Sequence, residues 1–153
     1  MILNNESLAF YLLDCMNQNK RVVFTNGCFD LIHQGHKDLL KKAKSFGDIL
    51  LVGLNSDRSV KRLKGIKRPI QNEMERAKNL CEFGSVDRVI IFYEDTPARL
   101  IADIKPDVLV KGGDYTIESI IGAGDVLASG GRVEIVPLTP GYSTTRNLEK
   151  MNR

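Results

Sequence analysis

The sequence predicts a three-layer α/β protein with a five-stranded parallel sheet, and three observations support this class. Five short apolar runs follow one another along the chain, stretches with helical spacing of apolar residues separate them, and turn residues mark the boundaries. Neighbouring parallel strands need long crossover connections, which helices supply with right-handed geometry. We therefore expect helices to cover both faces of the sheet.

The predicted strands are mostly apolar, which is typical of strands that are buried on both faces of a sheet. They comprise residues 21–26 (RVVFTN), 48–55 (DILLVGLN), 87–92 (DRVIIF), 107–113 (DVLVKGG) and 132–138 (RVEIVPL).

Helical spacing of Leu8, Leu12 and Cys15 predicts an N-terminal helix at about residues 4–19. In the pair Thr96-Pro97 we expect Thr96 as the N-cap and proline at the first helical position. Five other helices are predicted. One lies between the first strand and Gly47, one begins at Ser56, one spans 72–81, one spans 116–129, and the last begins after Ser143 or Thr144. Gly122 and Gly124 interrupt the pattern at 116–129.

Length and composition predict one globular domain over residues 1–153, with a core at about 20–150 behind the N-terminal helix. A net charge of +3 is too small to indicate nucleic-acid binding unless the charge is concentrated. The three cysteines, Cys15, Cys28 and Cys81, have no metal-binding spacing and are expected to be free thiols. The first twenty residues read as neither a signal peptide nor a membrane span, so we predict a cytoplasmic protein.

The segment TNGCFDLIHQGH (25–36) leaves the first predicted strand and carries the strongest functional signal. Ligands of such sheets bind beyond the carboxyl ends of the strands, and backbone N–H groups after Gly27 are suited to phosphate oxygens. His33 and His36 share a helix face and can donate to one anion, which indicates phosphoryl or nucleotidyl transfer. The simpler alternative makes His33 a helix cap and His36 a packed surface residue. Two histidines are too few for zinc, and no metal ligand can be named.

GCFDLIHQGH resembles the Gly-x-Phe-Asp-x-x-His-x-Gly-His signature of the nucleotidyltransferase superfamily that includes the glycerol-3-phosphate cytidylyltransferases. The resemblance implies a Rossmann-like fold in which His33 and His36 bind the triphosphate and stabilise the transition state, without a covalent enzyme intermediate. Five further segments are similar, in the same order, to bacterial heptose 1-phosphate adenylyltransferases, which also occur as the second domain of bifunctional ADP-heptose synthases. They are GLNSD (53–57), VKRLKGIKRPI (60–70), EDTPARLI (94–101), DVLVKGGDY (107–115) and GYSTT (141–145).

This resemblance covers about residues 20–150. The bifunctional synthases also have a kinase half, which this sequence lacks, so the resemblance implies the stand-alone form of the enzyme. The segment KRLKGIKR (61–68) has five cations and no acid, so it is either a solvated loop or a mobile loop that closes over a triphosphate. We expect Lys64 to be catalytic, together with His33 and His36.

The glycines of KGGDY let backbone approach a ligand and Asp114 can accept from hydroxyls, although an ordinary turn explains the same residues. Ser143 and Thr144 precede a predicted helix and make a plausible phosphate seat, although capping alone explains one of them. Phe29 is expected in the core and Cys28 as a packing residue rather than a nucleophile. The simpler alternative for Asp30 and Asn26 is that they stabilise the turn through hydrogen bonds between side chain and backbone. The resemblance implies nucleotide binding by Thr25, Asn26, Gly27, Cys28, Phe29, Gly35, Gly112, Asp114, Tyr115, Ser143, Thr144 and Thr145, and substrate binding by Asp30 and Lys111.

The function that the resemblance implies is transfer of AMP from ATP to D-glycero-D-manno-heptose 1-phosphate, giving ADP-heptose and pyrophosphate for bacterial envelope polysaccharide. Tyr115, where cytidylyltransferases commonly have tryptophan, favours ATP over CTP. Mg²⁺ is expected, bound mainly through nucleotide phosphates. Three alternatives stay open: a cytidylyltransferase for glycerol 3-phosphate or another small phosphate, a catalytically silent nucleotide-binding module, and a nucleic-acid binder that uses residues 61–68. We expect no nucleic-acid or membrane partner, and relatives of this kind commonly form homodimers.

Overall fold

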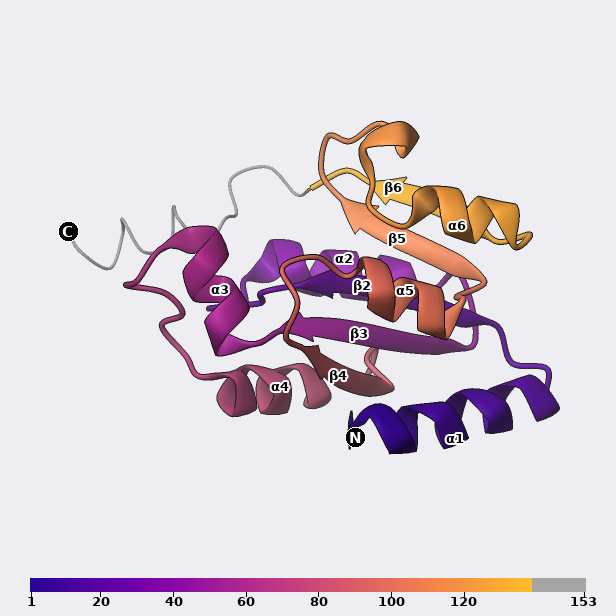
Figure 1. Ribbon diagram of the computed structural model, residues 1–153, viewed down its shortest axis with the longest axis horizontal. Helices are drawn as coiled ribbons and strands as arrows, with labels where there is room; N and C mark the ends of the chain where they lie inside the picture. Colours follow the sequence, from indigo (N-terminus) through magenta and orange to yellow (C-terminus); the bar gives the residue numbers. More distant parts are fainter. Residues whose placement is uncertain (139–153) are drawn as a thin grey trace.

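The computed structural model describes residues 1–138, and all of their strands form one parallel sheet (Figure 1). The strands are β1 (Ile2–Leu3), β2 (Val22–Gly27), β3 (Ile49–Asn55), β4 (Arg88–Phe92), β5 (Val108–Gly112) and β6 (Arg132–Val136). Their order across the sheet is β1-β4-β3-β2-β5-β6, and every neighbouring pair is parallel. The five predicted strands and the α/β class are confirmed, while the sheet has six strands rather than five.

The additional strand is β1, which forms the edge of the sheet and pairs with β4 through the register Ile2↔Val89 and Leu3↔Ile90. The N–H of Val89 donates to the carbonyl of Met1 at 2.9 Å. Two residues are too few for hydrophobic periodicity to develop, which is why the sequence pattern does not reveal this strand.

Within the described residues, six α-helices and a short 3₁₀ helix connect the strands. They are α1 (Asn5–Asn17), α2 (Gln34–Lys44), α3 (Asp57–Lys64), α4 (Glu73–Cys81), α5 (Ala98–Ile104), the 3₁₀ helix Ile117–Ser119 and α6 (Ala123–Ala128). The prediction for the start of α5 is wrong by one residue, because Pro97 takes the cap position and the Thr96 hydroxyl only accepts from the N–H of Ala98 at 3.4 Å. The helix predicted after Ser143 or Thr144 lies outside the described residues.

The single helix predicted at residues 116–129 is split into the 3₁₀ helix and α6. Gly122 adopts a φ of +86° between them, in the left-handed region that favours glycine. A Cβ atom there would also lie 2.8 Å from the Ile101 side chain, so the close packing of α5 and α6 depends on this glycine.

Helices cover both faces of the sheet, and each face has its own apolar core. Successive strand residues alternate between the cores: Phe24 and Leu51 pack with α1, α5 and α6, whereas Val23 and Leu50 pack with α2 and α4. In Figure 1, α5 lies in front of the sheet and α2 behind it. The predicted three-layer arrangement is therefore confirmed.

The chain order places a topological switch point between β2 and β5. The connections from β2 to β3 and on to β4 run toward one edge, and the chain then crosses back to place β5 on the other side of β2. In open α/β sheets ligands bind at such a point, beyond the carboxyl ends of the strands. Figure 1 shows α3 beyond this same end of the sheet.

Two further features of the described residues bear on the sequence predictions. Cys15, Cys28 and Cys81 are free thiols, as expected. Within residues 1–138, none of the helices combines the length and the apolar character that crossing a lipid bilayer requires.

Candidate active site

The loop between β2 and α2, residues 28–33, is here called the histidine loop. Phe29 and Leu31 have φ angles of +46° and +58°, two of the four positive values found at non-glycine residues in the described part of the chain. Left-handed backbone at such residues is costly and persists where the surrounding structure imposes it, often at functional sites. The Phe29 side chain supplies part of that constraint, because it is buried in the core as predicted.

His33 and His36 together cap the N-terminus of α2. Nδ1 of His33 accepts from the N–H of Gly35, and Nδ1 of His36 accepts from the N–H of His33, both at 3.1 Å. A backbone N–H only donates, so both Nδ1 atoms are unprotonated and each neutral ring carries its proton on Nε2. The rings stack with their centroids 3.8 Å apart.

The capping alternative for His33 is thus confirmed, and it is compatible with ligand binding because the cap uses only the Nδ1 atoms. Two Nε2–H donors beside the first turn of an eleven-residue helix form an arrangement suited to phosphate oxygens.

Burial keeps both rings neutral near pH 7. It lowers the pKa of His36 to about 4, with smaller contributions from His33 and from the Lys64 ammonium. Burial also lowers the pKa of His33 below its usual value of 6.5. Phe29 adds an apolar wall, with its ring centroid 5.3 Å from that of His36. The pair therefore offers hydrogen-bond donors rather than positive charges.

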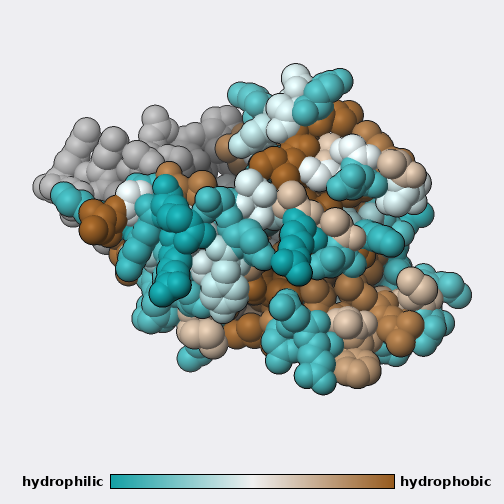
Figure 2. Space-filling view, in the orientation of Figure 1, coloured by the Kyte–Doolittle hydropathy of each residue, from teal (hydrophilic) through white to brown (hydrophobic). Residues whose placement is uncertain are grey.

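Lys64 is the last residue of α3, so the prediction that the whole segment 61–68 is a loop is wrong. Ser56 caps this helix by accepting from the N–H of Ser59, and Val60 is buried beneath it. Figure 2 shows hydrophilic side chains gathered over α3. The Lys64 charge contributes to lowering the pKa of His36, so α3 places this cation within electrostatic range of the His36 ring. Its catalytic role stays a prediction.

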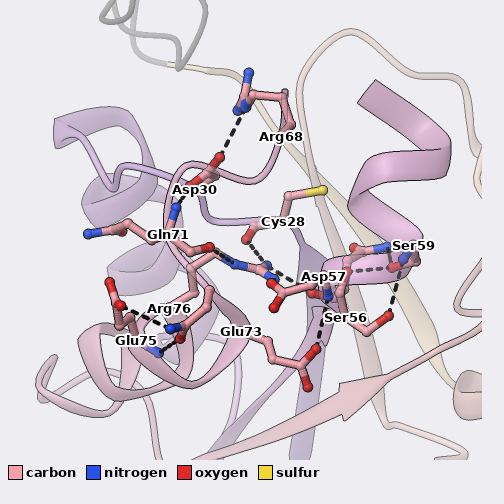
Figure 3. Close-up of polar contacts among 12 residues, drawn as sticks. Cys28, Asp30, Ser56, Asp57, Ser59, Arg68, Gln71, Glu73, Glu75 and Arg76 are labelled. Carbon is pink, nitrogen blue, oxygen red and sulfur yellow. Dashed lines mark hydrogen bonds and ion pairs between the residues drawn. The ribbon is translucent and has the colours of Figure 1, made fainter. Parts of the chain in front are cut away.

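A fully buried arginine on α4 links the histidine loop to the neighbouring elements. Nη1 of Arg76 donates to the carbonyls of Cys28 and Asn55, both at 2.8 Å, and Nε donates to the carbonyl of Gln71 at 2.9 Å. Nη2 pairs with the Asp57 carboxylate at 2.8 Å (Figure 3). Sequence reasoning missed Arg76, because an arginine on a mostly polar helix normally indicates a solvated face.

Asp30 anchors the connection from α3 to α4 against the histidine loop. Its side chain is 0% exposed and accepts from Arg68 Nε at 3.0 Å, from the N–H of Ile70 at 2.8 Å and from the N–H of Gln71 at 3.0 Å. Burial alone would raise the pKa of this carboxyl group, but the three hydrogen bonds and the Arg68 charge outweigh it and hold the pKa below its usual range. Direct substrate binding by Asp30 stays a prediction.

Across the switch point, β5 brings a second set of predicted residues toward β2. Asn26, Lys111 and Tyr115 line one small cavity of about 80 Å³. The Lys111 ammonium lies 5.3 Å from the centroid of the Tyr115 ring, and burial lowers the pKa of Lys111. Asp114 is exposed beside them. The volume is far below that of a typical nucleotide pocket, so the cavity fits only part of such a ligand.

The structure gives packing reasons for two glycines that were predicted to approach a ligand. A Cβ on Gly112 would lie 2.9 Å from the Leu39 side chain of α2, and one on Gly27 would lie 2.9 Å from the Phe29 ring. Both glycines therefore allow close packing around the histidine loop, and their nucleotide contacts stay predictions.

The remaining predicted nucleotide residues have varied positions. Thr25 is buried within β2, Gly35 is buried in the first turn of α2, and burial raises the pKa of the half-buried Cys28 thiol. Ser143, Thr144 and Thr145 lie outside the described residues. Within residues 1–138 no three His, Cys, Asp or Glu side chains meet as a metal site.

The two largest of the cavities found in the described part of the chain lie away from the histidine loop. One, of about 390 Å³, is at the amino ends of β2 and β5 beside Lys20, Arg21 and Lys105, and the other, of about 590 Å³, is beside Met1 and α4. Neither includes a residue of the histidine loop, so the chemistry of the side chains, rather than cavity size, identifies the candidate site.

Curated relatives match nearly the whole chain. The bifunctional protein HldE of Geobacter metallireducens is 53% identical over 152 residues, which cover 99% of this chain and 31% of that protein. The bifunctional protein HldE of Marinomonas sp. is 56% identical over 133 residues, which cover 87% of this chain and 28% of that protein. The chain thus spans less than a third of the length of these relatives.

The fold is also similar to a crystal structure described as the lipopolysaccharide core biosynthesis protein from Thermoplasma volcanium GSS1. The TM-score is 0.63 with 29% sequence identity, and the match covers 78% of this chain and 97% of that one. A family model described as cytidylyltransferase-like matches residues 24–146, a range that includes the histidine loop and the ends of β2 and β5. Because that match spans most of the sequence, the chain belongs to the cytidylyltransferase-like family.

Proposed function

We propose that this chain transfers AMP from ATP to D-glycero-D-manno-heptose 1-phosphate, releasing pyrophosphate and forming ADP-heptose. The observation that carries the chemistry is the pair of neutral histidines, His33 and His36, at the start of α2 and beside the switch point of the sheet. The acceptor is supported by identities above 50% to bifunctional HldE proteins and by the ordered resemblance to heptose 1-phosphate adenylyltransferases. The similar structure from lipopolysaccharide core biosynthesis supports a place in envelope polysaccharide synthesis.

The proposed reaction is one displacement at the α-phosphorus of ATP. A phosphate oxygen of the heptose 1-phosphate forms a bond to this phosphorus. The bond from the same phosphorus to the oxygen that bridges to the β-phosphate breaks, and its electron pair leaves with pyrophosphate. No protein nucleophile takes part, so the protein contributes orientation and stabilisation of charge.

The described residues suit these tasks. The Nε2–H groups of His33 and His36 would donate to phosphate oxygens, where hydrogen bonds strengthen as negative charge develops in the transition state. Lys64, at the end of α3, would neutralise charge on the departing pyrophosphate. Since the rings are neutral near pH 7, this donation needs no prior protonation step.

Mg²⁺ fits this site as an ion that the nucleotide brings with it. Magnesium bound to nucleotide phosphates keeps several waters and needs few protein ligands, so the phosphates themselves would hold most of it. When bound, it would supply further neutralisation of phosphate charge.

The test is pyrophosphate release by the purified protein with magnesium. ATP, CTP, GTP and UTP are each combined with heptose 1-phosphate, glycerol 3-phosphate and FMN. We expect release only with ATP and the heptose phosphate. Release with CTP and glycerol 3-phosphate would instead identify the cytidylyltransferase alternative, and no release from any combination would leave a binding module.

Two variants of His36 separate catalysis by this chain from a contaminating activity. In His36→Asn the amide oxygen can replace Nδ1 in the helix cap, but the Nε2–H donor is lost. In His36→Gln an amide N–H can reach the place of Nε2. We expect His36→Asn to lower kcat by roughly 100-fold or more with a much smaller effect on ATP binding, and His36→Gln to retain more activity. Equal losses of turnover and of ATP affinity would contradict the transition-state role.

A further inference from the structure

The guanidinium of Arg68 is buried beside the histidine loop without full hydrogen bonding. Its side chain is 12% exposed, and Nε donates to the Asp30 carboxylate at 3.0 Å. Among the residues 1–138, Nη2 of Arg68 is the only buried side-chain nitrogen or oxygen that has no hydrogen-bond partner. A buried charged donor without an acceptor is costly, so such an atom calls for a ligand or another compensating group.

Asp30 fixes the orientation of this guanidinium. The carboxylate is itself held by the N–H groups of Ile70 and Gln71, so the turn around Arg68 is anchored even without the arginine side chain. In Figure 3 one side of the Arg68 guanidinium meets the Asp30 carboxylate, and one nitrogen points away from it. The remaining nitrogens of the Arg68 guanidinium are therefore not needed to anchor the connection from α3 to α4.

The position of Arg68 relates it to the candidate active site. Its partner Asp30 lies in the histidine loop, three residues before His33. The charges of Lys64 and Arg68 both act on the Cys28 thiol of this loop, so both cations lie within electrostatic range of it. A planar guanidinium fork matches two oxygens of a phosphate group, which a single ammonium cannot do.

We propose that Arg68 binds a phosphate group of a substrate and that Asp30 is the positioning residue that holds its guanidinium for this contact. The inference rests on the proposed function for the identity of the ligands, which are the phosphate of the sugar 1-phosphate or the phosphates of the nucleotide. Both present the same chemistry to the guanidinium, and binding measurements distinguish them.

The experiment is isothermal titration calorimetry of the full chain and of Arg68→Gln with ATP, inorganic pyrophosphate and heptose 1-phosphate. We expect Arg68→Gln to raise the Kd of at least one of these ligands by roughly 10- to 100-fold, because a charge-assisted hydrogen bond to phosphate is lost. Arg132→Gln is the matched control. Arg132 is an arginine in an exposed ion pair with Glu134 on β6, and we expect its removal to leave every Kd unchanged.

The ligand that is weakened assigns the contact. Loss of affinity for heptose 1-phosphate alone places Arg68 at the acceptor, and loss for ATP and pyrophosphate alone places it at the nucleotide. A folded Arg68→Gln with wild-type affinity for all three ligands overturns the proposal, as does a wild-type chain that binds none of them.

Arg68→Lys is the second variant. It keeps the charge but not the fork, so it keeps the proposal testable if Arg68→Gln does not fold. An affinity at least about tenfold below wild type supports a fork-specific contact, and wild-type affinity overturns it. Calorimetry needs no turnover, so a chain that binds these ligands yet releases no pyrophosphate would reject the proposed reaction while the test of Arg68 still stands.

Discussion

At the scale of single residues, the same two rings serve the fold and the proposed chemistry. The cap requires an unprotonated Nδ1 on both His33 and His36, because each faces a backbone N–H donor. Protonation would set two donors against each other, and burial opposes it as well. The local fold thereby fixes the tautomer that directs each remaining proton to Nε2.

We expect the two histidines to titrate below the usual range. The pKa of His36 should lie at about 4 and that of His33 below 6.5, measured from the pH dependence of the imidazole C–H signals by NMR. The assignment follows from the loss of one signal in His36→Asn. A midpoint at or above 6.5 for His36 in the folded chain would contradict the buried capping arrangement.

The same shift predicts a pH dependence of stability. The folded pKa of His36 is below its unfolded value near 6.5, so between about pH 6.5 and 4 the unfolded chain binds more protons. This contribution is fully present above pH 6.5 and is lost as the pH falls toward about 4. Asp30, whose pKa is also lowered, loses its contribution only at lower pH, below its usual value of 3.8. Urea unfolding at several pH values should show a shallower loss above pH 4 in His36→Asn, and identical slopes would contradict this linkage.

At the scale of secondary-structure elements, Arg76 joins the histidine loop, β3, α3 and α4 through four hydrogen bonds. Arg76→Met would leave three buried or half-buried carbonyls and the Asp57 carboxylate without this partner. We expect it to lower the free energy of unfolding by about 3 kcal/mol or more in urea denaturation. Arg76→Lys should lose much of this stability too, because one ammonium cannot reach all four acceptors.

Arg132→Met is the control for this prediction, because it removes an exposed arginine whose ion pair with Glu134 is worth at most about 1 kcal/mol. If Arg76→Met and Arg132→Met had the same small effect, the linking role of Arg76 would be wrong.

The elements that could be predicted from the sequence are those whose pattern is long and local. β3 is a continuous apolar run, and the segment 25–36 combines a strand end, a glycine and a helix start within twelve residues. Features that depend on long-range contacts leave no such pattern in the sequence. β1 exists only because β4 offers it an edge, and Arg76 is buried only because acceptors from two distant segments, Cys28 and Asn55 with Asp57, meet its guanidinium.

The connection from α3 to α4 illustrates why a local pattern also misleads. The cations of residues 61–68 suggested a loop, either solvated or closing over a triphosphate, but a capping serine and the buried Val60 extend α3 to Lys64. Beyond Gly65, the buried Asp30 holds Arg68 rather than leaving it in solvent. Neither the cap nor the buried carboxylate can be recognised from charge alone, because both depend on which surface the segment meets.

At the scale of the whole molecule, the sheet lies between two apolar cores, and each of its central strands contributes side chains to both. Leu50 and Leu51 are adjacent residues of β3, both fully buried, yet Leu50 packs toward α2 and α4 whereas Leu51 packs toward α1, α5 and α6. The site depends on both faces, because α2 carries the histidines on one face while β2 and β5 are also held from the other.

Leu50→Ala and Leu51→Ala test whether these faces form one cooperative unit. Each substitution removes a fully buried leucine and should lower the free energy of unfolding by about 2–5 kcal/mol. Because the two side chains emerge from one strand, we expect each variant to unfold in a single transition that coincides in far-UV circular dichroism and tyrosine fluorescence. Tyr11 packs against the core that contains Leu51, so its emission reports on the face opposite to Leu50. Separate transitions in Leu50→Ala would mean that the α1 face survives without the α2 face, and the predicted single domain would then consist of two units.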